Sequence, residues 1–213
     1  MRRYSKRISA VVGATLLGVA GAAATFAITG AAANPAVKQT SFQMVRSAAA
    51  VGANCLQGAE AKVTIQSRGP VEVMKVSARH LPRNTDFDLF VIQVPNGPFG
   101  ISWYQGDLDS NSKGRADGTF IGRFSIETFA VAPGAAQAPQ VHQSPIPDAT
   151  QNPAFGPVHT YHLGLWFNSP ADAVAAGCPG AITPFNGDHT AGVQALSTRN
   201  FPDQFGPLRH VQP

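Results

Sequence analysis

The stretch "DFDLFVIQV", residues 86–94, decides the fold class. Apolar side chains fill both of its alternating phases, with Phe87, Leu89 and Val91 in one phase and Phe90, Ile92 and Val94 in the other. Because successive side chains of a strand point to opposite faces, this pattern predicts a central strand that is covered on both sides. The prolines and glycines of "PNGPFG", residues 95–100, end the strand.

Further strand patterns lie on both sides of this segment. "EAKVTIQS", residues 60–67, alternates, whereas "VEVMKVSARHL", residues 71–81, shifts its apolar phase between Val73 and Met74, which predicts a bulge. "ISWYQGDL" and "ADGTFIGRF" flank a polar turn at 109–115 and predict a hairpin. Three more segments have strand character, namely "SIETFAVAP" (125–133), "VHTYHLGLWF" (158–167) and "TAGVQALST" (190–198).

One short helix is expected at residues 169–177. Ser169 is a suitable N-cap, Pro170 occupies the first helical position, and Gly177 is placed to end the helix. About seven or eight strands with one short helix predict an all-β fold, an antiparallel β-sandwich of the immunoglobulin-like or Greek-key type. A small barrel is the alternative.

The first 33 residues have the pattern of a secretory signal peptide. Four basic residues precede a long uncharged segment, and "AAA" at 31–33 offers a cleavage site near Ala33. We therefore expect export by the Sec route and a secreted, extracellular protein; a membrane contact would arise only from an uncleaved signal. Residues 34–54 are predicted as an N-terminal arm and 55–213 as a single domain, with a proline-rich loop insert at 133–157.

Charge and cysteine content limit the classes of partner. The chain has 16 Lys and Arg against 12 Asp and Glu, and four of these cations lie in the signal, which leaves 12 against 12 after cleavage. A balanced chain without a basic patch does not favour a nucleic-acid partner. Cys55 and Cys178 are the two cysteines, and in a secreted chain they predict one disulfide bond.

Three segments carry a resemblance to known sequences. They are "LPRNTDFDLFVIQVPNGPFGISWYQGDL", "YHLGLWFNSPADAVAAGCP" and "TPFNGDHTAGVQALSTRNFPD". Over residues 55–207 the chain resembles a group of uncharacterised secreted bacterial proteins of the actinobacterial type. The resemblance implies an exported β-sandwich and implies no activity.

An aromatic loop is the candidate ligand site. Phe99, Trp103, Tyr104 and Gln105 are residue types that bind a glycan or another small ligand, with rings for stacking and an amide for hydrogen bonds. Trp103 shares the phase of Ile101 in the expected strand, which favours burial of Trp103 and exposure of Tyr104. The opposing interpretation is that Trp103 and Trp166 fill the core of the sandwich.

Metal sites are not favoured. His159 and His162 are three residues apart, so on a regular strand they point to opposite faces and do not bind one ion. Asp107, Asp109 and Asn111 begin like a calcium loop, but the glycine and the glutamate that such a loop requires are replaced by Ser112 and Gly118. We predict neither a metal ion nor a cofactor.

The sequence does not favour catalysis, and we assign no catalytic residue. We predict a non-catalytic extracellular binding or surface-associated protein. One alternative is a secreted hydrolase that uses Glu127, placed inside an apolar segment, together with Asp107 or a histidine. The other alternative is a purely structural component of the cell envelope.

Overall fold

The fold is built from antiparallel strands, as the sequence predicts. The structure is a computed structural model that describes residues 39–133 and 155–213. Its strands are β1 (Gln39–Arg46), β2 (Glu60–Ser67), β3 (Glu72–Arg79), β4 (Phe87–Ile92), β5 (Ser102–Asp107), β6 (Ala116–Gly122), β7 (Phe129–Pro133), β8 (Phe155–His159), β9 (His162–Phe167) and β10 (Gln194–Ser197). Its helices are α1 (Ala48–Gly52), α2 (Pro170–Ala175) and the short 3-10 helix Pro207–His210.

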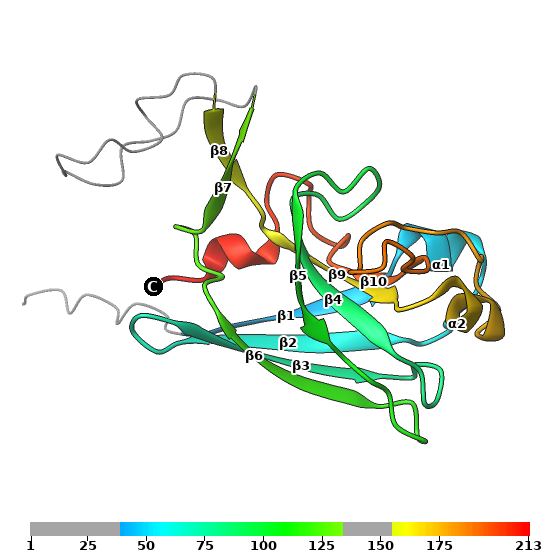
Figure 1. The fold of residues 1–213 in the computed structure, drawn as a ribbon. Helices are drawn as coiled ribbons and strands as arrows, with labels where there is room; N and C mark the ends of the chain where they lie inside the picture. The colour runs from blue at the N-terminus through cyan, green and yellow to red at the C-terminus, as the bar shows by residue number, and fades with distance from the viewer. Residues whose placement is uncertain (1–38, 134–154) are drawn as a thin grey trace, which may run out of the picture. The chain divides into compact units, whose positions relative to one another are not determined.

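Eight of these strands form one continuous sheet that folds into two facing halves. The order is β5-β4-β9-β10-β1-β2-β3-β6, while β7 and β8 pair with each other (Figure 1). The sheet changes direction at β1, because residues 39–44 pair with β2 whereas Val45 and Arg46 pair with β10. The half β1-β2-β3-β6 therefore faces the half β5-β4-β9-β10, which gives the all-β sandwich.

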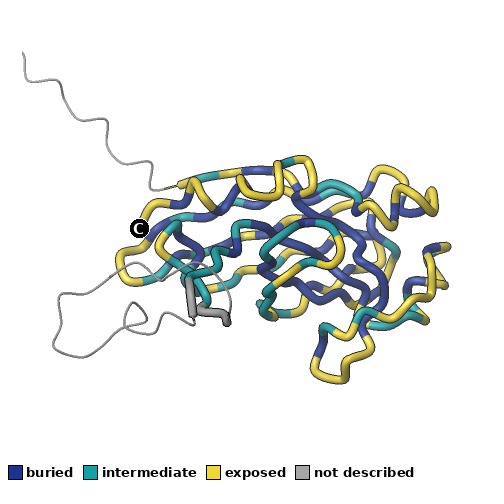
Figure 2. Tube along the Cα trace, turned by 90° about the horizontal axis from the view of Figure 1, so that it is seen from above, coloured by how far each residue is buried: buried dark blue, intermediate teal, exposed yellow. Residues whose placement is uncertain are grey.

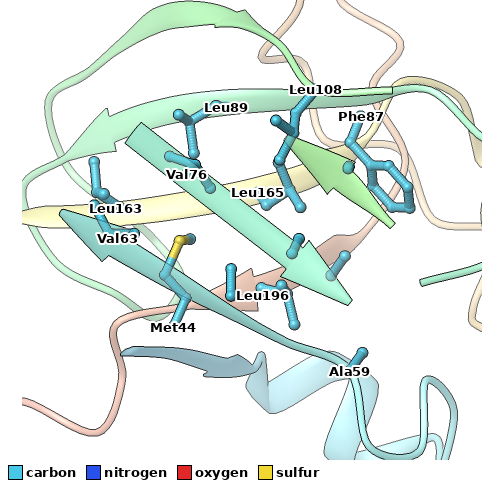
Figure 3. Packing of buried hydrophobic residues seen from close by; sticks show 14 of the residues in the cluster. Met44, Ala59, Val63, Val76, Phe87, Leu89, Leu108, Leu163, Leu165 and Leu196 are labelled. Carbon is cyan, nitrogen blue, oxygen red and sulfur yellow. The ribbon is translucent and has the colours of Figure 1, made fainter. Parts of the chain in front are cut away.

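The main core lies between the two halves. Leu89 and Leu165 come from one half and meet Val63 and Val76 from the other (Figure 3). Buried and exposed segments alternate along the chain (Figure 2), and the strands that are buried at every position are β4, β9 and β10. β4 and β9 are buried at every position, so both of their faces are covered.

Where the structure describes the predicted N-terminal arm at 34–54, its residues form a strand and a helix. Gln39–Arg46 is the strand that joins the two halves, and Ala48–Gly52 is helix α1. Met44 is fully buried in the core. The segment lacks a clear apolar period because β1 has several polar positions, and its pairing partners come from distant parts of the chain.

Two local expectations are also corrected. β3 pairs with β2 and β6 without any shift in register, so no bulge lies between Val73 and Met74. Strands β5 and β6 do not form a hairpin, because β5 pairs with β4 and β6 pairs with β3. Residues 108–115 instead run along the turn at 81–85, where the Ser110 hydroxyl donates to the Thr85 carbonyl at 3.1 Å.

The expected helix and the disulfide are confirmed. Helix α2 begins at Pro170, and the Ser169 hydroxyl accepts a hydrogen bond from the backbone N–H of Asp172. Cys55 and Cys178 are bonded, with their Cα atoms 5.4 Å apart. The disulfide ties the segment after α1 to the segment after α2.

Some predictions fall on residues outside the described ranges. These are the signal peptide at 1–33 and most of the insert, residues 134–154. At its two ends, Pro133 belongs to β7 and 155–157 belong to β8, and these strands pair. Among the helices that the structure describes, none is both long and apolar enough to cross a membrane.

Candidate functional site

A second, smaller apolar cluster covers the outer face of β4 and β9. Phe90, Ile92 and Trp166 point away from the main core and pack under the loops at 95–100 and 183–191. Trp166 is fully buried there. The Phe99 ring meets it edge-on with centroids 4.9 Å apart, and the Phe185 ring lies at the same centroid distance.

A bulge in β5 shapes the edge of this cluster. Leu89 pairs with Gly106 and Phe90 pairs with Tyr104, so Gln105 is the extra residue. Without the bulge, residues 104 and 107 would point to opposite faces of the strand. With it, the Tyr104 hydroxyl donates a hydrogen bond to Oδ1 of Asp107 at 2.6 Å. The bulge therefore brings an aromatic ring and a carboxylate together on the outer face.

Asp88 lies directly opposite Asp107 on the neighbouring strand. Its side chain is 2% exposed, and its Oδ2 forms no hydrogen bond of normal geometry among the described residues, although the nearby Asn186 side chain acts to lower the pKa of the carboxyl. Burial, reinforced by the nearby Asp107 carboxylate, raises the pKa of Asp88 from 3.8 to about 6. An unpartnered carboxylate is costly to bury, so this position favours an external donor over a structural role.

These residues border one open pocket of about 490 Å³. Its lining comprises Asp88, Tyr104, Asp107, Asn168, Phe185, Asn186, Gly187 and Asp188. The Asn186 amide donates to the backbone carbonyl of Asn168 at 2.9 Å, and its Oδ1 accepts from the Thr190 N–H at 2.8 Å. These bonds fix the 183–191 loop as one wall, while β4 and β5 supply the other.

The structure places the predicted ligand residues in different positions. Tyr104 is half exposed and lines the pocket, as its predicted outward direction requires. Trp103 packs against the main core, and Phe99 is partly buried beneath the loops. Gln105 is the bulged residue, and it does not line this pocket. Of the four, Tyr104 alone borders the cavity that contains Asp88.

Sequence reasoning missed the loop that forms the other wall of the pocket. Phe185, Asn186 and Asp188 come from a loop about 80 residues after β5, and no local pattern connects them to Tyr104. Asp88 did carry a signal, because it is an acid inside the most apolar strand of the chain. A charge at such a position is a stronger sign of a site than a charge in a turn.

The expectation for Glu127 is wrong. Its side chain is 66% exposed and pairs with Arg123 at 3.5 Å. It precedes β7 rather than lying within a strand, and it does not line the pocket of Asp107. The buried glutamate is Glu72, which accepts a hydrogen bond from the Phe124 N–H at 2.7 Å and pairs with Arg123 at 3.2 Å.

No arrangement of metal ligands is present in the described part of the chain. No group of three His, Cys, Asp or Glu side chains there is placed to hold an ion. His162 is buried between Thr198 and the Asp203 carbonyl, and burial lowers its pKa. Asn111, the third residue of the calcium-like run, accepts hydrogen bonds from its own turn, at the N–H groups of Lys113 and Arg115.

No family model, curated protein or solved structure matches this chain. The resemblance to uncharacterised secreted bacterial proteins therefore stays a prediction, and the function has to be argued from the pocket.

Proposed function

We propose that the protein is a secreted, non-catalytic binding protein that holds a small polar ligand in the pocket over the β5 bulge. The observation that carries the proposal is Asp88, a buried acid that borders an open cavity and whose Oδ2 forms no hydrogen bond of normal geometry with the described residues. The half-exposed Tyr104 ring beside it supplies an apolar wall. A ligand that donates a hydrogen bond to Asp88 would offset the cost of burying that oxygen.

Two further features support an extracellular binding role. The Cys55–Cys178 disulfide suits an oxidising compartment, in agreement with the signal-like N-terminus. The buried Asp88 borders an open cavity, which favours a binding role over a purely structural one. Binding sites often retain polar groups that weaken the free protein.

The test is a binding screen with the purified protein and its Asp88→Asn variant. A panel of saccharides, amino acids, amines and organic acids is assayed by thermal shift, and hits are measured by calorimetry. We expect at least one class to bind the wild type and to lose tenfold or more in affinity for the variant. The proposal would be overturned if the wild type and the variant bound every hit with equal affinity, or if no compound in the panel bound.

A hydrolase that uses Asp88 in place of Glu127 is the second candidate. The specific observation is the pair of directly opposed carboxyls, one of which has a pKa raised to about 6 beside the exposed Asp107. Such a pair suits a general acid and a nucleophile or base. Chromogenic glycosides and esters test it, since turnover that Asp107→Asn abolishes would establish catalysis, and turnover that persists in the variant would exclude this pair.

A further inference from the structure

The side-chain donors of the pocket are almost all occupied. The Tyr104 hydroxyl donates to Asp107. The Asn186 amide nitrogen donates to the Asn168 backbone carbonyl at 2.9 Å and to its side-chain oxygen at 3.2 Å. Only the exposed amide nitrogen of Asn168 is left among the lining side chains as an uncommitted donor. A ligand that donates hydrogen bonds therefore fits this pocket better than one that only accepts them.

The acceptors of the pocket that remain available are carboxylate oxygens. Oδ2 of Asp88 forms no hydrogen bond of normal geometry with the described residues, and the Tyr104 hydroxyl donates to only one oxygen of Asp107, Oδ1. Asp188 adds a third carboxylate to the lining. A neutral sugar presents donors and acceptors in equal number, so half of its groups would face carboxylate oxygens that cannot donate. A ligand that only donates fits this set better.

The charged side chains that line the pocket are acidic. Among the residues that the structure describes, no Lys, Arg or His belongs to its lining. The charged neighbours that act on Asp88 are Asp107 and Asp109, and those that act on Asp109 are Asp86 and Asp107. Every one of them is a carboxylate. Since the chain after cleavage is balanced, this concentration is local, and it repels anions while attracting a cation.

The walls favour an organic cation over a metal ion. Tyr104 and Phe185 line the pocket, and both rings pack on Phe90, with centroids 5.7 and 5.2 Å from it. Aromatic faces attract ammonium groups and bury alkyl chains. A volume of about 490 Å³ is that of a small-molecule site, and the described residues hold no group of three metal-ligating acids.

We propose that the pocket binds a small organic ammonium ion, whose N–H groups donate to Asp88 and Asp107 and whose carbon chain lies against Tyr104 and Phe185. The inference deepens the proposed function and rests on it. The charge pairs with the two carboxylates, and the N–H groups satisfy the buried oxygen that forms no hydrogen bond of normal geometry within the described part of the chain.

The experiment compares probes that differ in one property. Butylammonium, its neutral analogue 1-butanol and its anionic analogue butyrate are titrated calorimetrically at pH 8 into the wild type, Asp88→Asn, Asp107→Asn and the control Asp117→Asn. Asp117 is exposed on β6 in the other half of the sandwich. We expect butylammonium to bind the wild type and the control equally and each pocket variant at least tenfold more weakly. We expect neither butanol nor butyrate to bind.

Several results would overturn the inference, and they are distinguishable from failure of the proposed function. If a neutral saccharide binds in an Asp88-dependent manner and butylammonium does not, the site is a binding site for another class. If Ca²⁺ binds with the same dependence, the site is a metal site. If 1-butanol binds as tightly as butylammonium, the positive charge contributes nothing to binding. If nothing in the wider panel binds, the proposed function fails as well.

Discussion

The substitution Asp88→Asn is predicted to stabilise the free protein at neutral pH. The carboxyl has a pKa near 6 in the folded protein against 3.8 unperturbed. Two pKa units correspond to about 3 kcal/mol, and the open side of the pocket reduces the expected effect to about 2 kcal/mol. An amide keeps the shape and removes the charge, so this cost disappears in the variant.

The pH dependence fixes the sign of the effect. Below about pH 3 the carboxyl is protonated in both folded and unfolded chains, and the two proteins differ little. Between about pH 3 and pH 6 the folded wild type keeps a proton that the unfolded chain loses, so its stability falls as the pH rises. Above pH 6 the cost is fully present. The advantage of the variant should therefore grow from near zero to about 2 kcal/mol.

Urea denaturation at pH 4 and pH 8 measures this difference. With an ordinary dependence on denaturant, the midpoint of Asp88→Asn should lie roughly 1 M above that of the wild type at pH 8 and much closer to it at pH 4. Asp117→Asn serves as the control and should change stability by less than about 0.5 kcal/mol. A variant that is less stable at pH 8 would show that the carboxylate has a structural partner, and the reasoning would be refuted.

Three further predictions concern other parts of the chain. Mass spectrometry of the exported protein should find Asn34 as the first residue, and an intact N-terminus would contradict the expected cleavage. The Cys55–Cys178 bond closes a loop over a sequence separation of 123, so its reduction should lower the free energy of unfolding by about 4–5 kcal/mol in the chain-entropy model. Urea denaturation with and without reductant tests this, and equal midpoints would refute it. Gly106→Ala should cost about 1–3 kcal/mol, because residue 106 has φ 151° and its Cβ would lie 2.7 Å from the Phe120 ring; an unchanged midpoint would contradict this packing.

The strand at the centre of the fold was predictable from its own residues. Both phases of 86–94 are apolar, and β4 is buried on both faces. The direction of Trp103 and Tyr104 and the pairing of the two cysteines also followed from local rules. The strand positions follow from a short-range pattern, and two cysteines allow only one intramolecular pair. The tertiary structure agrees with both.

The wrongly predicted bulge in β3 arises from the burial of a charged residue. Glu72 points into the interior and is fully buried, where its carboxylate accepts from the Phe124 N–H and pairs with Arg123. Because an acid is normally assigned to the outer face, its presence mimics a change of phase and predicts a bulge that β3 does not have. The actual bulge, at Gln105, has no signal in the sequence beyond the neighbouring Gly106.

The pocket could be predicted only in part. Tyr104 and Asp107 were recognised as candidate residues, but as members of separate sites. Their partnership depends on a one-residue bulge, and the opposite wall depends on a loop that packs over β9 after a long excursion of the chain. Long-range contacts of this kind are fixed by the whole fold rather than by a local pattern.

The ionisation of Asp88 gives the most direct test of the proposed site. Carboxyl-detected NMR can follow the titration of this side chain in the free protein and in the presence of butylammonium. We predict a pKa near 6 without ligand and a clear decrease on adding the amine, because a bound cation favours the charged carboxylate. A carboxyl that titrates near 3.8 in the free protein, or that ignores the amine, would contradict the proposal.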